Sequence, residues 1–90
     1  MAFTFDPDKS ARNVANRGLP FDLVERLEWE TALVVEDIRK GYGETRLQVL
    51  ALMQGCLYAV VVTLRGEDLR VISFRKASRK EVIRYGKKDG

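Results

Sequence analysis

Runs of β-branched and aromatic residues fill most of the second half of the chain, and short glycine-containing links separate them. The three main runs and their two links are residues 45–53, 54–55, 57–65, 66–68 and 69–76. Such residues suit a pleated, partly buried surface, and links of two to three residues join antiparallel neighbours. The pattern therefore predicts three consecutive antiparallel strands, with further strands at 2–5 and 31–36.

A helical period precedes these strands. Asp6 is a good N-cap, and Pro7 suits the first helical position, where its missing N–H leaves no intrahelical hydrogen bond unmade. Small apolar residues then recur at intervals of three and four, at Ala11, Val14, Ala15 and Gly18. This spacing predicts a helix whose narrow apolar face packs closely on a sheet or another helix, and Gly18 is suited to end it.

A second, shorter helix is predicted to begin near Pro20. The residues on its periodic face are Phe21, Val24 and either Leu27 or Glu28. Trp29 either ends this helix or begins the next strand. After that strand, the polar and glycine-containing residues 37–43 predict a connection.

The last strand passes into a helix at a defined point. Ser78 and Glu81 have the spacing of a capping box, in which each side chain binds a backbone N–H that the helix start leaves unsatisfied. Together the elements predict an α+β fold, with two N-terminal helices, a C-terminal helix and helices on one face of a largely antiparallel sheet. We expect residues 1–90 to form a single domain.

Positive charge is concentrated in the second half of the chain. Residues 1–38 carry a net charge of −4 and residues 39–90 a net charge of +7. The strand–turn–helix unit at 69–85 alone holds six cations: Arg70, Arg75, Lys76, Arg79, Lys80 and Arg84. A focused positive field favours nucleic acid as the partner, with an acidic protein as the rival and an ordinary solvated surface as the simplest alternative.

Strand alternation predicts which polar side chains share a face of the sheet. Three pairs lie two residues apart and therefore project to the same side within each strand: Arg46 with Gln48, Thr63 with Arg65, and Ser73 with Arg75. If the hairpin registers align these pairs, they form a cation-bearing patch. Tyr58 and Phe74 lie in apolar strands and are expected in the core, whereas Tyr42 and Trp29 are candidates for stacking on bases.

Several classes of protein are disfavoured by composition. The single cysteine, Cys56, cannot form an internal disulfide and is expected to be a buried structural thiol. The chain has no histidine, and its scattered carboxylates do not form a recognisable metal site. No apolar run is long enough to span a bilayer, and early charges argue against a signal peptide, so we expect a cytoplasmic protein.

Four groups of residues carry a resemblance to a known family. They are Phe3-x-Phe5-Asp6-Pro7 with Lys9, Gly18-x-x-Phe21, Tyr42-Gly43-Glu44-x-Arg46, and Arg70-Val71-Ile72-Ser73-x-Arg75-Lys76-Ala77 with Glu81 and Tyr85. In this order and spacing the chain resembles the BrnT toxins. The resemblance implies a compact RelE/ParE-like fold, RNA cleavage and arrest of translation. It also implies a BrnA-like antitoxin partner, through which the complex would bind operator DNA.

One departure from the family affects the expected chemistry. BrnT toxins often carry a histidine just before the Tyr-Gly-Glu motif, where this chain has Gly41. Cleavage through the 2′-hydroxyl needs a base, stabilisation of the phosphorane and protonation of the leaving oxygen. The resemblance and residue chemistry together give the candidate catalytic residues Glu44 as base, Arg46 and Arg75 on the phosphate, and Tyr85 near the leaving group. The candidate RNA-binding residues are Arg65, Arg70, Lys76 and Arg79, and no metal or cofactor is expected.

Structural interpretations of the same residues remain open. Glu44 and Arg46 have the spacing of a simple ion pair at a strand start, and Tyr85 has a position from which it can pack on the sheet. Two other functions are also compatible with the sequence. One is a basic module that binds nucleic acid or an acidic partner without chemistry, and the other is a ParE-like toxin that acts on a topoisomerase.

Overall fold

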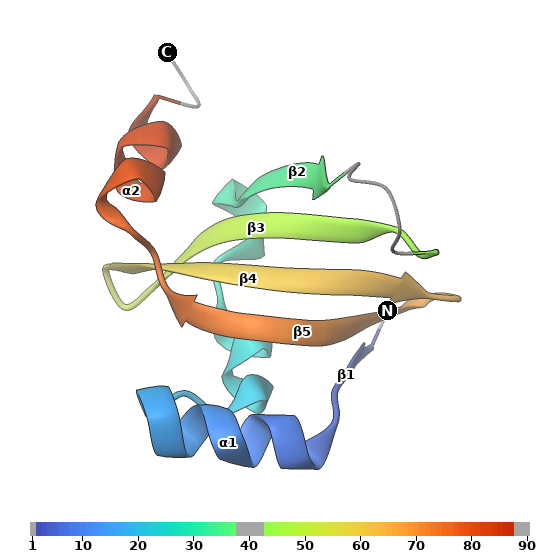
Figure 1. Cartoon of the computed structure of the whole chain (residues 1–90). Coiled ribbons are helices and arrows are strands. Elements are labelled where there is room, and N and C mark those ends of the chain that lie inside the picture. The colour runs from blue at the N-terminus through green and yellow to red at the C-terminus, as the bar shows by residue number, and fades with distance from the viewer. Residues whose placement is uncertain (1, 38–42, 88–90) are drawn as a thin grey trace.

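The computed structural model describes residues 2–37 and 43–87, which form one five-stranded sheet with helical segments around it (Figure 1). The elements in chain order are β1 (Phe3–Thr4), α1 (Pro7–Arg17), the 3₁₀ helices η1 (Phe21–Arg26) and η2 (Trp29–Thr31), β2 (Leu33–Asp37), β3 (Arg46–Met53), β4 (Cys56–Arg65), β5 (Asp68–Lys76) and α2 (Arg79–Gly86). This arrangement confirms the predicted α+β class. The connection predicted at 37–43 and its Tyr42 lie largely outside the described residues.

The sheet has the strand order β1-β5-β4-β3-β2. The neighbours β2, β3, β4 and β5 pair antiparallel, as the short links predict, whereas the two-residue β1 pairs parallel with β5. Gln54 and Gly55 make the two-residue turn of the β3–β4 hairpin with positive φ angles of 52° and 81°. The sheet is therefore largely antiparallel, as predicted, with one short parallel addition at its edge.

Helix α1 begins and ends where the sequence predicts. The Asp6 side chain accepts a hydrogen bond from the Asp8 backbone N–H (2.9 Å), and Pro7 is the first helical residue. Gly18 closes the helix in the left-handed conformation (φ 70°), and its N–H donates to the Val14 carbonyl. Both termini are thus fixed by the local chemistry that predicted them.

The predicted packing face of α1 is wrong. Ala11, Val14 and Ala15 are exposed, and the residues that the helix buries are the polar Ser10 and Asn13. Ser10 Oγ accepts the Phe21 N–H (2.9 Å), and Asn13 Nδ2 donates to carbonyls of the next turn and of β5. The helix docks through these hydrogen bonds because buried backbone groups beside it need partners.

The second predicted helix forms as the short 3₁₀ segment η1, whose Phe21 and Val24 are buried together with the following Leu27. It ends at Arg26, and Trp29 opens the separate 3₁₀ turn η2, so neither alternative for Trp29 was correct. The Trp29 indole N–H donates to the Val24 carbonyl (3.0 Å). These segments cover one face of the sheet and complete the core with residues that include Val49, Tyr58, Val60, Val62, Val71 and Phe74.

Tyr58 and Phe74 are buried against each other, as expected, with ring centroids 5.4 Å apart. Cys56, in contrast, is exposed, which corrects the expectation of a buried thiol. It opens β4 directly after the Gly55 turn, at the end of the hairpin. Hydrophobic residues flanking a turn therefore do not all reach the core.

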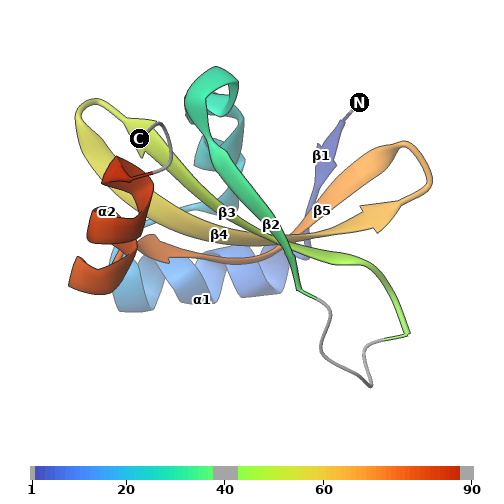
Figure 2. The ribbon, with the colours of Figure 1, turned by 90° about the horizontal axis from the view of Figure 1, so that it is seen from above.

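Helix α2 begins with the predicted capping box. Ser78 Oγ accepts the Glu81 N–H (3.3 Å), and Glu81 Oε1 accepts the Ser78 N–H (2.8 Å). The prediction that all helices lie on one sheet face is wrong for α2. Its residues line a pocket with side chains of the face opposite the core, and Figure 2 shows α2 on the other side of the sheet from the 3₁₀ segments.

Candidate functional site

The hairpin registers place the predicted polar pairs on one face of the sheet. Across β3 and β4, Arg46 lies opposite Thr63, and across β4 and β5, Ser73 lies opposite Val61 and Arg75 opposite Ala59. A bulge at Ile72 shifts the register, so that Arg70 lies opposite Thr63 and joins the same face. We call this surface the polar face; it is the side of the sheet away from the aromatic core.

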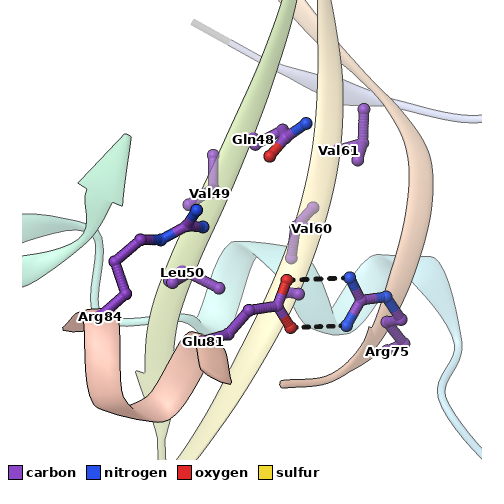
Figure 3. A pocket seen from close by; sticks show the side chains of 9 residues that line it. Gln48, Val49, Leu50, Val60, Val61, Arg75, Glu81 and Arg84 are labelled. Carbon is purple, nitrogen blue, oxygen red and sulfur yellow. Dashed lines mark hydrogen bonds and ion pairs between the residues drawn. The ribbon is translucent and has the colours of Figure 1, made fainter. Parts of the chain in front are cut away.

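One end of the polar face contains a pocket of about 220 Å³ beneath α2. Figure 3 shows that Arg75 of β5 and Glu81 and Arg84 of α2 surround it, with Gln48 farther along β3. Valine, leucine and alanine of β3 and β4 form its floor. The pocket thus presents two guanidinium groups and one carboxylate above an apolar floor.

Arg75 is held in a fixed orientation. Its Nη1 and Nη2 donate to the two carboxylate oxygens of Glu81 at 2.7 and 3.0 Å, and Nη1 also donates to the Lys76 carbonyl (3.2 Å). Two parallel N–H···O bonds fix the plane of a guanidinium as well as its position. Since Glu81 also belongs to the capping box, the start of α2 determines where Arg75 points.

The ion pair keeps Glu81 charged over the whole physiological range. The Arg75 hydrogen bonds are the main cause that lowers the pKa of Glu81 to about 2, and the Ser78 backbone N–H acts in the same direction. The same pair raises the pKa of Arg75. A carboxylate with so low a pKa is a weak proton acceptor, so the chemistry of this pocket is electrostatic rather than basic.

A second charged group lies at the opposite end of the polar face. Glu44 pairs with Arg46 (3.5 Å) and with the more exposed Arg65 (3.4 Å). Thr63 is fully buried beside this group, and its hydroxyl donates to the Thr45 carbonyl (2.8 Å), which anchors the strand start. The ion pair between Glu44 and Arg46, which the sequence left open as a structural alternative, is therefore present, with Arg65 as a third member.

The four candidate catalytic residues do not come together in one site. Leu50 of β3 lies opposite Ala59 of β4, which lies opposite Arg75 of β5. Arg46 is four residues from Leu50 along β3, a distance of about 13 Å of strand. The Tyr85 hydroxyl donates to the carbonyl of Thr31, the last residue of η2, at 3.1 Å. The residues thus divide into a Glu44 group, an Arg75 group and Tyr85 between α2 and η2.

The candidate RNA-binding residues are also distributed over several places. Arg65 and Arg70 lie on the polar face, and Arg79 is the exposed first residue of α2. Lys76 lies opposite Tyr58 and so projects from the other face of β5. Only two of the four share the polar face with Arg75.

Sequence reasoning missed two residues of the pocket, Arg84 and Gln48. Arg84 follows Glu81 by three residues on α2, a spacing that places both on one side of a helix. Gln48 was recognised as a polar-face residue but not as part of a site, and its Nε2 donates to Asp37 Oδ2 (3.3 Å). The helical spacing from Glu81 was the signal that could have found Arg84.

The described residues offer neither a metal site nor a membrane-spanning helix. Within residues 2–37 and 43–87, no three His, Cys, Asp or Glu side chains are grouped in a way that could hold a metal ion. No helix in the same ranges is long and apolar enough to cross a membrane.

Comparison with known proteins identifies the family. A comparison with curated proteins finds no match to the chain. The family described as "Ribonuclease toxin, BrnT, of type II toxin-antitoxin system" matches residues 5–81, which include α1, the Glu44 group, Arg75 and Glu81 and end before Arg84 and Tyr85. A match over most of the chain shows that this protein belongs to the BrnT family of ribonuclease toxins of type II toxin–antitoxin systems.

Proposed function

We propose that this protein is an endoribonuclease toxin that cleaves RNA without a metal ion, and that the pocket beneath α2 holds the scissile phosphate. The observation that carries the proposal is the pair of guanidinium groups, Arg75 and Arg84, at one small pocket of the polar face. Guanidinium groups bind phosphate oxygens bidentately and stay ionised at any physiological pH. They can therefore supply the positive charge that a phosphorane requires.

In this proposal Arg75 is the principal catalytic residue and Arg84 supports it from α2. Glu81 is a positioning residue, since it holds the Arg75 fork in its plane. The Glu44 group lies about 13 Å along the sheet, so Arg46 and Arg65 contact a neighbouring part of the RNA rather than the same phosphate. Tyr85 can reach a leaving group only when it gives up its hydrogen bond to Thr31.

Cleavage then depends on positioning and charge rather than on a strong base. The chain has no histidine, and Glu81 is ionised but weakly basic. Glu44 is the remaining candidate base, and it would act only on RNA bent toward it. We therefore expect a slow nuclease whose rate depends strongly on how RNA is presented.

The family context completes the proposal. Membership implies an antitoxin partner, and we propose that this partner is BrnA-like and responsible for operator binding by the complex. We propose that the toxin itself is cytoplasmic. We also propose that RNA cleavage arrests translation and that residues 1–90 form one RelE/ParE-like domain. Occupation of the polar face by the antitoxin would explain how the toxin is silenced.

The test is incubation of the antitoxin-free protein with a long RNA in EDTA, beside Arg75→Ala, Arg75→Lys and Arg84→Ala. We expect fragmentation by the wild type and a loss of roughly 100-fold or more for Arg75→Ala, the usual effect of removing a donor to a charged transition state. Arg75→Lys should lose much of the activity as well, because an ammonium cannot reproduce the bidentate fork. Lys80→Ala, an exposed change on the same helix outside the pocket, is the control.

Equal cleavage by Arg75→Ala and the wild type would remove Arg75 from the mechanism. Intact RNA with the wild type would favour a second candidate, a module that binds RNA or an acidic partner without chemistry. One observation supports that alternative, because the Arg75 fork is already occupied by Glu81. Salt-dependent RNA binding with no product would then be the expected result.

A further inference from the structure

Helix α1 carries a basic stripe that faces the last strand. Lys9, Arg12, Asn16 and Arg17 follow the i, i+3, i+7, i+8 spacing of one helix face. They line a pocket of about 290 Å³ together with Ile72 and Ser73 of β5. Three cations from the acidic first half of the chain thus lie beside the strand that leads to Arg75.

A second pocket connects this stripe to the candidate site. It has a volume of about 440 Å³ and is bounded by Arg17, Leu19, Arg75 and Lys76. It shares Arg17 with the pocket along α1 and Arg75 with the pocket beneath α2. The three pockets therefore form one series that passes from α1, across the edge of β5 near Arg75 and Lys76, to α2.

This path is open because β1 is short. It pairs only with Leu69 and Arg70, so among the described residues β5 has no strand partner on that side from Val71 onward, and α1 runs along this edge (Figure 1). Among the described residues lining the three pockets, Glu81 is the only carboxylate. Asp8 is next to Lys9 in the first turn of α1 but lines none of the three pockets.

We propose that these pockets form a binding track for single-stranded RNA that extends from the candidate site across the β5 edge onto α1. The inference rests on the proposed ribonuclease function and deepens it by naming where the flanking RNA lies. The cations Lys9, Arg12, Arg17, Lys76, Arg75 and Arg84 succeed one another along the track. A row of separate cations beside polar side chains fits a phosphate backbone.

Lys76 acquires a role in this arrangement. It points away from the polar face, so it could not share one site on that face with Arg70 and Arg75. On the track it is the cation between Arg17 and Arg75. The path also explains why the basic side chains of α1 lie toward β5 while its apolar Ala11, Val14 and Ala15 face solvent.

The test measures the affinity of the protein for two 2′-O-methyl oligoribonucleotides, one of about twelve nucleotides and one of about three. Neither can be cleaved through the 2′-hydroxyl, so binding is measured without reaction. The variant Lys9→Gln/Arg12→Gln removes two cations from the far end of the track. The matched control Arg26→Gln/Lys80→Gln removes two exposed cations that line none of the three pockets. Thermal unfolding of both variants checks that the fold is kept.

We expect the track variant to bind the longer oligonucleotide about tenfold more weakly and the shorter one as the wild type does. The slope of log affinity against log salt should fall by roughly 1.4, which corresponds to two phosphate contacts on a single strand. The control should keep both affinities. Equal losses in the two variants, or unchanged binding by the track variant, would overturn the track.

The outcome is separable from that of the proposed function. Wild-type binding that depends on Lys9 and Arg12, but without cleavage of ordinary RNA, would retain the track and reject the nuclease. Cleavage of ordinary RNA by the wild type, together with unchanged RNA binding by the track variant, would retain the nuclease and reject the track. If the variant loses affinity for polyglutamate but not for RNA, the surface binds an acidic protein segment, and the proposal is wrong.

Discussion

Asn13 shows how one polar side chain can determine the position of a helix. It is only 6% exposed, and its Nδ2 donates to the Leu19 carbonyl at 2.7 Å and to the Phe74 carbonyl at 2.9 Å. One amide group therefore joins α1, the turn that follows it and the last strand. Its Oδ1 also accepts a hydrogen bond from Arg17 (3.0 Å), which steadies a cation of the proposed track.

We predict that Asn13→Ala lowers the free energy of unfolding by about 2 kcal/mol, because two buried carbonyls lose their donor. Asn16→Ala, the same change at an exposed position of the same helix, should stay within about 0.5 kcal/mol of the wild type. Chemical denaturation of the three proteins measures both values. Equal effects at the two positions would show that the Asn13 hydrogen bonds contribute little.

Residue-scale burial was the least predictable property of this sequence. The apolar period of α1 indicated Ala11 and Val14, whereas the helix buries Ser10 and Asn13. The period reports where apolar side chains lie but not where a distant carbonyl requires a donor. The carbonyl of Phe74 lies 61 residues from Asn13, and no local pattern in the sequence relates the two.

At the scale of elements, α2 is attached to the sheet by polar contacts. None of its residues is buried, and Val82 and Ile83 are 51% and 53% exposed. The Arg75–Glu81 pair joins it to β5 and the Tyr85 hydrogen bond to Thr31 joins it to η2, while the capping box stabilises its own first turn. The stability of α2 should therefore respond to charge more than that of the core does.

Acid should weaken the attachment of α2. The pKa of Glu81 is lowered from 4.5 to about 2, so its contribution is present above pH 4.5 and is lost as the pH falls toward 2. Since the Arg75 side chain is 43% exposed, solvent screens the pair and we expect about 1 kcal/mol.

The variant Glu81→Gln can keep the capping box but not the charge. Its free energy of unfolding should lie below that of the wild type near neutral pH, and the two should converge as the pH falls from 4.5 to 2. Denaturation over a pH series tests this. A constant difference between the two proteins would assign the contribution to packing instead.

The β3–β4 turn carries a residue in an unfavourable conformation. Gln54 has a φ of 52°, which a non-glycine side chain adopts at a cost, and both turn residues need positive φ in a tight hairpin of this kind. We predict that Gln54→Asn raises the free energy of unfolding by about 0.5 kcal/mol, since asparagine tolerates this region better.

Gly55→Ala should lower the free energy of unfolding by about 1 kcal/mol, because alanine is strained at a positive φ. The cost is conformational rather than steric, since no heavy atom other than those of its chain neighbours lies within 4 Å of the added Cβ. Thermal unfolding of both variants measures the two shifts, and a stabilised Gly55→Ala would contradict the assignment.

Element boundaries were predictable where their chemistry is local. Asp6, Gly18 and the Ser78–Glu81 box mark the helix ends correctly, and the glycine links mark the hairpins. The bulge at Ile72 carries no comparable signal, because it depends on how β4 and β5 align. The charged groups of the polar face were therefore predictable by residue type, but their division into two groups was not.

At the scale of the whole molecule, folding rearranges the charge that the sequence separates. The acidic first 38 residues nevertheless contribute Lys9, Arg12 and Arg17 to the same surface as Arg75. A net charge per segment reports none of this, since the carboxylates of that segment lie on other elements or at the start of α1. Surface charge has to be counted after the elements are placed.

The hydrogen bond from Asn13 to the Phe74 carbonyl also has a consequence for the order of events during synthesis. Contacts between residues far apart in the chain form late and slow down folding. Helix α1 leaves the ribosome before β5 does, but it reaches its place only after β5 has been made. A nascent chain therefore cannot assemble the proposed RNA track until β5 has been synthesised and α1 has docked beside it.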